Sequence, residues 1–213
     1  MLHQPRWLTL MALTCIAALV SLPPHRAGAV GAPVAAATVS RQNAEAFSQK
    51  VSLIRQHGDL GPRGGARRTP VTQDELNSWF AFGAQPYLPN GVSQPEVTIV
   101  GRGQLAGQAI VDLDAIAKRR ATGSTFDPWA FIGGRVPVKV AGILHTRDGM
   151  ARLEIQSAEI SGVPVPPTLL QELVSFYSRS PERPQGVRLD ETFALPANIR
   201  QIEVGQGQAV VVQ

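Results

Sequence analysis

The chain has 213 residues with a formal net charge of +4, and only 6% of its residues are aromatic. That length fits one ordinary domain behind an N-terminal extension, and basic residues do not alternate with aromatic ones as in many nucleic-acid-binding proteins. A single cysteine, Cys15, argues against both a disulfide framework and a cysteine-rich metal site.

The first 29 residues have the order of a secretory signal peptide. Arg6 precedes an apolar run at residues 8–22, two prolines break the run, and small residues at 27–29 suit cleavage. The run of about 15 residues is shorter than the roughly 20 that span a bilayer. We therefore expect cleavage near Ala29 and a periplasmic or secreted protein whose mature chain has no cysteine.

Two alternatives for this segment stay open. A retained segment would act as an N-terminal membrane anchor. Acylation of Cys15 would make the protein a lipoprotein, although Ala12-Leu13-Thr14 before it fits a lipobox poorly. Cleavage is favoured over both because the run is short and continues past Cys15.

Residues 30–39 contain no charge and predict a flexible mature N-terminus, so that a single domain covers 40–213. Ser40 predicts the N-cap of a first helix, whose apolar residues recur at helical spacing until Gly58. A second helix is predicted from the Thr-x-x-Glu spacing of a capping box that begins at Thr72.

From Pro95 onward the apolar period changes from that of a helix to that of a strand. Strands are expected on both sides of the turn at 101–103. A hairpin is expected around Asp148-Gly149, since an Asp-Gly pair suits a tight turn. Asp114 is a candidate cap for a short helical piece, and residues 168–178 predict a third amphipathic helix.

A last hairpin is predicted around the turn at 205–207, whose sequence is like that of the turn at 101–103. We interpret this likeness as recurring strand and turn chemistry. The final strand, 209–213, could present an exposed sheet edge. Together these elements predict an α+β fold in which a curved antiparallel β-sheet meander packs against two or three amphipathic helices.

The polar side chains form no recognisable catalytic or metal site. His57 lies at a helix end and His145 at a hairpin tip, without partners at metal-ligand spacing. Asp112 and Asp114 would share a strand face but supply too few oxygens for calcium. Both glycine turns precede strands, whereas a dinucleotide site needs a helix there. We expect no metal, no cofactor and no enzyme activity; a hydrolase with an unrecognised triad is the weakest alternative.

A basic loop holds Arg63, Arg67 and Arg68. These side chains could face the anionic headgroups of a membrane, where each basic residue contributes about 1 kcal/mol to binding. A solvated loop without a partner is the plainer interpretation of the same residues.

Bulky apolar side chains are the most distinctive feature that remains. Trp79 and Phe80 lie on the second predicted helix, and Leu169, Leu173 and Phe176 lie on the third. These five residues are either ordinary core or the lining of a pocket for an acyl chain, since apolar ligand sites are lined in this way.

Two segments have a familiar pattern. Val71-Thr72-Gln73-Asp74-Glu75-Leu76-Asn77 has the form T-x-x-E-L-N at a helix start, and Ile160-Ser161-Gly162-Val163-Pro164-Val165-Pro166 runs into the leucine-rich third helix. Both resemble segments of bacterial secreted lipid-binding proteins of the TULIP-like kind. The resemblance implies a sheet with a helix on its concave face, a single half-tubule, and a fold that binds lipids without reacting them.

We therefore expect a non-enzymatic extracytoplasmic protein that binds a hydrophobic small molecule or lipid between the curved sheet and its helices. The alternative is a cell-envelope structural or assembly module that binds a protein partner through a sheet edge. A membrane surface is a candidate partner, and nucleic acid is not an expected one.

Overall fold

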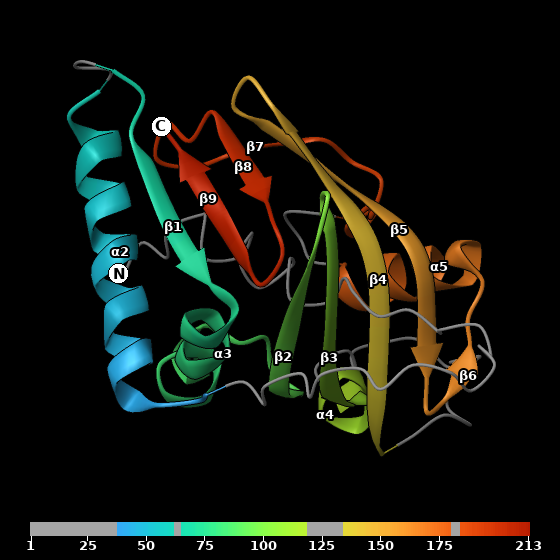
Figure 1. Cartoon of the computed structure of the whole chain (residues 1–213). Coiled ribbons are helices and arrows are strands. Elements are labelled where there is room, and N and C mark those ends of the chain that lie inside the picture. Colours follow the sequence, from blue (N-terminus) through green and yellow to red (C-terminus); the bar gives the residue numbers. More distant parts are fainter. Residues whose placement is uncertain (1–37, 62–64, 119–133, 180–183) are drawn as a thin grey trace, which may run out of the picture.

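The computed structural model describes residues 38–61, 65–118, 134–179 and 184–213. These residues form four α-helices, a six-stranded antiparallel sheet and a three-stranded antiparallel sheet (Figure 1). The expected α+β class, an antiparallel meander packed against helices, is confirmed. The division of the strands between two sheets is a feature that the sequence does not indicate.

The larger sheet is a meander of four long strands with two short strands at its edge. Strands β2 to β5 follow one another in space as along the chain, while β6 pairs with the end of β5 and β7 with its start. The bounds are Val92–Gly101 for β2, Gln104–Asp112 for β3, Arg135–Arg147 for β4, Met150–Ile160 for β5, Val163–Pro164 for β6 and Phe193–Ala194 for β7. The predicted hairpin joins β4 to β5, and both of its turn residues, Asp148 and Gly149, have positive φ.

The smaller sheet has the strand order β1-β9-β8. Its strands are Arg68–Thr72 (β1), Gln201–Val204 (β8) and Gln208–Val212 (β9). The last strand is therefore central, and the expectation of an exposed edge at 209–213 is wrong. The reason is a non-local pairing: β1 lies far earlier in the chain and pairs with β9 along its whole length, which no local pattern indicates.

The principal helices begin where the sequence predicts. Their bounds are Arg41–Asp59 for α2, Gln73–Phe82 for α3, Leu113–Lys118 for α4 and Pro167–Ser178 for α5, with a short 3-10 helix η1 at Gln85–Tyr87. The Ser40 hydroxyl accepts a hydrogen bond from the Asn43 N–H at 3.1 Å. Thr72 and Glu75 form the reciprocal capping box, which satisfies two donors at the start of α3.

The short helix α4 is capped by a different residue from the one predicted. The Asp112 carboxylate accepts a hydrogen bond from the Ala115 N–H at 2.8 Å, so Asp112 rather than Asp114 is the cap. The cause is that β3 ends at Asp112 and the helix follows at once, which places Asp114 in the first turn. A carboxylate there still favours the helix dipole.

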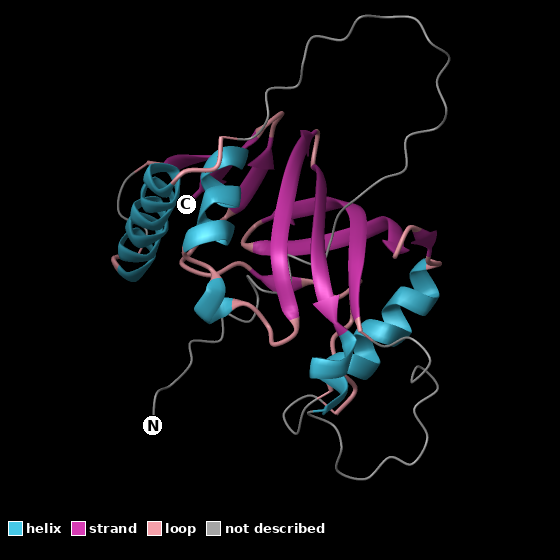
Figure 2. Cartoon of the chain, turned by 90° about the horizontal axis from the view of Figure 1, so that it is seen from below, coloured by secondary structure: helices cyan, strands magenta, loops and turns pink. Residues whose placement is uncertain are grey.

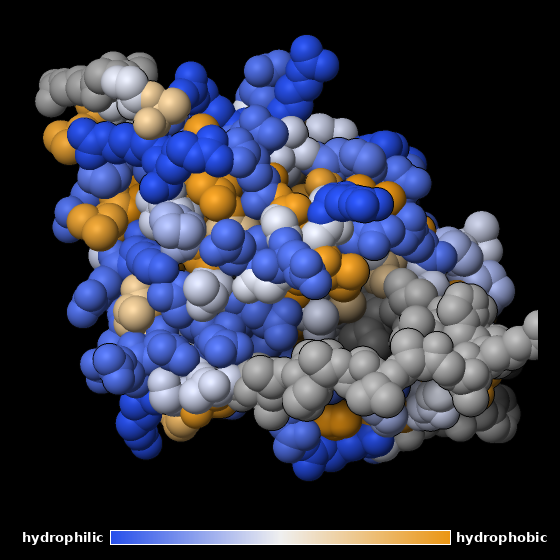
Figure 3. All heavy atoms as spheres, viewed as in Figure 1, coloured by the Kyte–Doolittle hydropathy of each residue, from blue (hydrophilic) through white to orange (hydrophobic). Residues whose placement is uncertain are grey.

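The register of the larger sheet separates a polar face from an apolar one, because residues directly opposite each other point to the same side. Glu96, Gln108, Lys139 and Glu159 form one such row across β2 to β5. The Gln108 amide donates to the Glu96 carboxylate at 2.7 Å. Figure 3 shows the described part of this side as largely hydrophilic. Helix α5 lies behind β4 and β5 in Figure 1, on the opposite, apolar face.

The two glycine turns with similar sequences lie against each other. The Gly103 N–H donates to the Val204 carbonyl at 3.3 Å, and the Gly207 N–H donates to the Ile99 carbonyl at 2.8 Å. A Cβ at Gly101, whose φ is positive, would lie 3.4 Å from the Gln206 nitrogen. The β2–β3 and β8–β9 hairpins thus join the two sheets turn to turn (Figure 1).

Candidate functional site

The apolar face of the larger sheet extends from β2 to β5. Paired residues on this face are all apolar or glycine in four successive rows. The rows are Val97–Gly107–Val140–Ala158, Ile99–Leu105–Gly142–Ile155, Ala109–Val138–Ile160 and Val111–Val136. Helices lie at both ends of this layer of strands, as Figure 2 shows.

Helix α3 covers the β2 end of the apolar face. Phe80 is buried against Val97 and Ile99, and Trp79 packs against the same cluster while remaining half-buried. Trp79 also contacts Phe47 of α2, with ring centroids 5.3 Å apart. Trp79 and Phe80 are therefore components of a packed core that fastens α3 to the sheet.

Helix α5 covers the β4–β5 end of the same face. Leu170 is buried against Val140 and Leu153, and Val174 packs beside it. Leu169, Leu173 and Phe176 are half-buried and occupy helix positions i, i+4 and i+7. Residues at this spacing form a stripe along one side of a helix.

The five predicted lining residues thus belong to two groups rather than one. Trp79 and Phe80 lie on α3, which contacts β2, whereas the three residues of α5 lie beside β5. The stretch between the helices consists of apolar sheet residues that sequence analysis did not select. Val138, Leu144 and Ile155 are half-buried and pack against the cluster of α5, and the alternation along β4 and β5 is the signal that could have found them.

The T-x-x-E-L-N segment closes the edge of the larger sheet. Asn77, which is 4% exposed, donates its amide N–H to the Val97 carbonyl and accepts from the Val97 N–H, both at 2.8 Å. The Gln73 side chain accepts from the Ile99 N–H at 2.8 Å. Unpaired strand edges invite association with other chains. The motif therefore has a structural role in this protein, with Thr72 as helix cap.

The other strand edges of the two sheets carry similar side-chain contacts. The Thr146 hydroxyl donates to the Ile202 carbonyl at 2.9 Å and accepts from the Ile202 N–H at 3.0 Å, which ties β4 to β8. Lys50 donates to the carbonyl of Pro70 in β1 at 2.7 Å. Pro70 has no N–H to offer, as is usual for proline in edge strands. Sequence analysis missed all of these contacts because the partners are distant along the chain.

Lys50 also forms an ion pair with Glu75 at 2.7 Å, between α2 and α3. Partial burial raises the pKa of the Glu75 carboxyl, but hydrogen bonds from Lys50 and the Thr72 N–H outweigh it and bring the pKa below its ordinary value. This pair links the two helices that cover the β2 end of the fold.

The predicted basic loop is only partly present as a charged surface. Arg63 lies outside the described residues, and Arg67 is exposed and pairs its backbone with Gln213. Arg68 is not a loop residue: it begins β1 and forms two hydrogen bonds with the Glu203 carboxylate, one of them 2.9 Å long. The hydrogen bond lowers the pKa of Glu203 and raises that of Arg68. Among the three arginines of the predicted loop, Arg68 therefore has its charge paired with the Glu203 carboxylate.

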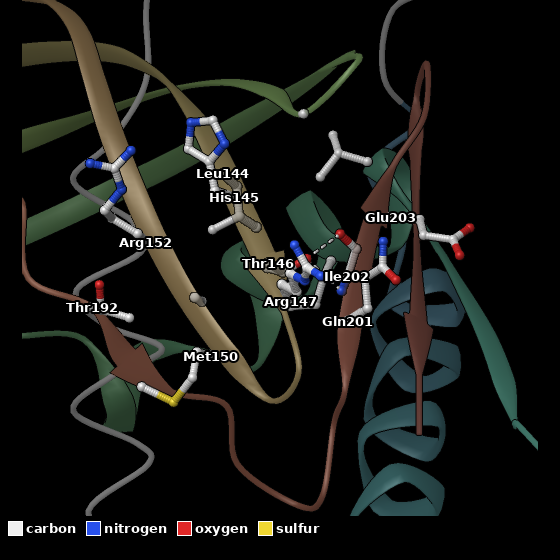
Figure 4. A pocket seen from close by; sticks show the side chains of 13 residues that line it. Leu144, His145, Thr146, Arg147, Met150, Arg152, Thr192, Gln201, Ile202 and Glu203 are labelled. Atoms are coloured by element: carbon white, nitrogen blue, oxygen red, sulfur yellow. Dashed lines mark hydrogen bonds between the residues drawn. The ribbon is translucent and has the colours of Figure 1, made fainter.

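An open groove of about 630 Å³ lies between the β4–β5 hairpin and β8 (Figure 4). Figure 4 shows His145 and Arg152 side by side at this groove, and His145 Nε2 lies 3.0 Å from a Glu154 oxygen. The Thr146 hydroxyl also lines the groove, and it is hydrogen-bonded to both the carbonyl and the N–H of Ile202. Beside the groove the Arg152 guanidinium lies 3.6 Å from the Glu154 carboxylate, which is the ion pair of this region.

A second hollow of about 670 Å³ lies at the end of α2. His57 lines it from the last turn of the helix, and its buried Nδ1 has no hydrogen-bond partner among the described residues. The Gln213 amide N–H groups donate to the carbonyls of Ile54 and Ala197 at 2.8 and 2.6 Å. Gln213 therefore holds the end of α2 against the turn before β8, a packing role rather than a chemical one.

The described residues include no group of three or more histidine, cysteine, aspartate or glutamate side chains placed to hold a metal ion. In the same residues, no helix has the length and apolar character needed to cross a membrane. No protein-family description, curated protein or solved structure matches this chain.

Proposed function

We propose that this protein binds a hydrophobic ligand, an acyl chain or lipid, against the apolar face of the larger sheet and beside α5. The observation that carries the proposal is the half-buried apolar surface that β4 and β5 share with α5, formed on the strands by Val138, Leu144 and Ile155.

The half-buried stripe on α5 supports the same proposal. Leu169, Leu173 and Phe176 lie beside the core residues Leu170 and Val174, so the helix has more apolar surface than its contact with the sheet uses. Each methylene group that a ligand buries there contributes about 0.8 kcal/mol. An acyl chain of ordinary length could therefore bind through contacts with the sheet and this stripe, without any charged group in the protein.

Binding rather than catalysis is the activity that these side chains offer. The candidate ligand surface consists of hydrocarbon groups, which exclude water and orient a chain but transfer no protons. The signal-peptide pattern at the N-terminus supports a place of action outside the cytoplasm, in the periplasm or beyond it.

The experiment compares two matched phenylalanine substitutions. Phe176 and Phe82 both lie near the end of an α-helix, and each has an arginine over its ring, at 5.8 and 5.0 Å to the centroid. We expect Phe176→Ser to weaken uptake of a fluorescent fatty acid about tenfold, since about 1.4 kcal/mol of contact is lost. Phe82→Ser, outside the proposed site, should leave uptake unchanged.

Native mass spectrometry of the protein purified from its own cell envelope gives the second readout. A co-purified lipid that is depleted in Phe176→Ser but retained in Phe82→Ser would support the proposal. A wild-type protein without lipid and without uptake of the fluorescent fatty acid would contradict it.

A further inference from the structure

An aromatic end, defined by Val39, Trp79, Phe82 and Tyr87, lies where the chain enters the fold. Val39, Phe82 and Tyr87 are 47%, 45% and 44% exposed, and all three are large apolar side chains. The Ser40 N–H donates to the Ser78 hydroxyl at 3.1 Å, which sets Val39 beside the helix turn that leads to Phe82. Isolated exposed apolar residues are common, but a cluster of them indicates an interaction surface.

The aromatic end is rigid because Trp79 lies between two other rings. Trp79 contacts Phe47 at 5.3 Å and stacks on Tyr87 at 5.9 Å with an interplanar angle of 19°. Gly83 makes room for the indole: a Cβ there would lie 2.9 Å from Trp79 Cδ1. The exposed Tyr87 ring is thus held by stacking on Trp79, which packs against the core.

The composition of this end matches the interface between lipid and water. Tyr and Trp combine an apolar ring with a polar group and are enriched at the headgroup level of membranes. The Arg41 guanidinium lies over the Phe82 ring, 5.0 Å from its centroid, and thus places a cation beside the exposed ring. A cation at that depth can contact lipid phosphates, which contributes about 1 kcal/mol.

The chain outside the described residues leads to the same surface. The apolar run at 8–22 is followed by about 16 residues before Val39. Those residues span at most roughly 50 Å when fully extended. As a retained membrane anchor, the run would hold Val39, at the start of the described fold, within that distance of the bilayer.

We propose that the aromatic end docks this protein on the surface of a lipid bilayer, with the rings of Phe82 and Tyr87 among the headgroups. This docking surface is separate from the proposed ligand surface beside α5 and from the basic loop, whose contact with a membrane stays a prediction. The partner is the bilayer itself rather than a single bound lipid, so the two proposals can fail independently.

The test uses vesicles of equal parts phosphatidylcholine and phosphatidylglycerol. The full-length chain is expressed and recovered as its host processes it, and vesicle flotation measures its partitioning. Loss of two inserted rings in Phe82→Ser with Tyr87→Ser should lower partitioning at least about tenfold. Replacement of both residues by Trp should preserve it or raise it, because Trp is enriched at the membrane–water interface. Phe176→Ser should partition like the wild type.

Circular dichroism and the urea midpoint of the Phe82 and Tyr87 variants show whether they are folded, and their fatty-acid uptake separates the two proposals. Normal uptake with lost flotation supports the docking surface. Equal flotation of the double-serine variant and the wild type overturns it, whatever the uptake result. A wild type that does not float but self-associates, with Phe82→Ser restoring a monomer, also overturns it and assigns the surface to a second copy of the chain.

Discussion

Helices α3 and α5 lie over the same face of the larger sheet, yet they are fastened in different ways. The first turn of α3 has a complete capping box, formed by Thr72 and Glu75. α5 begins with Pro167 after Pro166, without a side-chain cap, so its start depends on the fixed φ of proline. Helix α3, which has the capping box, closes the β2 edge of the larger sheet. Helix α5, which has no side-chain cap, borders the proposed ligand surface.

Both helices use an amide side chain to hold a neighbouring backbone segment. Asn77 of α3 binds both backbone groups of Val97, and Gln171 of α5 donates to the Val187 carbonyl at 3.0 Å and accepts from the Leu189 N–H at 2.6 Å. Asn77 is buried, whereas Gln171 is half-buried. The same pair of amide–backbone hydrogen bonds is therefore shielded from water at Asn77 and accessible to water at Gln171.

Removing the two amides would measure this difference directly. In Asn77→Ala, two buried backbone groups lose their partners, and we expect a loss of about 4 kcal/mol in the free energy of unfolding. Gln171→Ala should cost about 1 kcal/mol, because water can reach the groups it leaves. Urea denaturation of the two variants beside the wild type checks both values. Equal losses in the free energy of unfolding would show that the two amide side chains stabilise the fold equally.

Leucine substitutions within α5 would separate its core side from its ligand side. Leu170 is 3% exposed, and Leu170→Ala should lower the free energy of unfolding by about 3 kcal/mol through the cavity it leaves. Leu173→Ala, at a half-buried position, should cost less than about 1 kcal/mol and yet weaken fatty-acid uptake. A Leu173→Ala protein with full uptake would remove this side of α5 from the ligand surface.

The start of α3 was predictable because its signals are local. Thr72 and Glu75 are three residues apart, and the alternation along β4 and β5 lies within one hairpin, so composition and spacing suffice. The likeness between the turns at 101–103 and 205–207 was also visible, although their mutual contact was not.

The rest of the candidate site depends on contacts between residues far apart in the chain. The pairing of β1 with β9 and the clamp from Thr146 to Ile202 join residues separated by more than fifty positions. The hydrophobic pattern could show that α5 is apolar over a wide arc, but not which side meets the sheet. In the structure Leu170 packs on Val140 and Leu153 of these strands, and Leu169 beside it is only half-buried.

The smallest expected effect is a pH dependence confined to α3. The pKa of Glu75 lies below its ordinary value of 4.5 in the folded protein, because hydrogen bonds from Lys50 and the Thr72 N–H outweigh the opposing effect of burial. A lowered folded-state pKa means that ionised Glu75 contributes stability above pH 4.5, and that the contribution disappears as the pH falls through the lowered value.

The stability difference between the wild type and Glu75→Gln should therefore be constant near neutral pH and shrink below about pH 4.5. Urea midpoints from pH 7 to about pH 3 give this difference. The same series in a Lys50→Met background should lose most of the pH dependence, since Lys50 supplies the side-chain hydrogen bond. A difference that stays constant to about pH 3 would show that Glu75 acts through packing rather than charge.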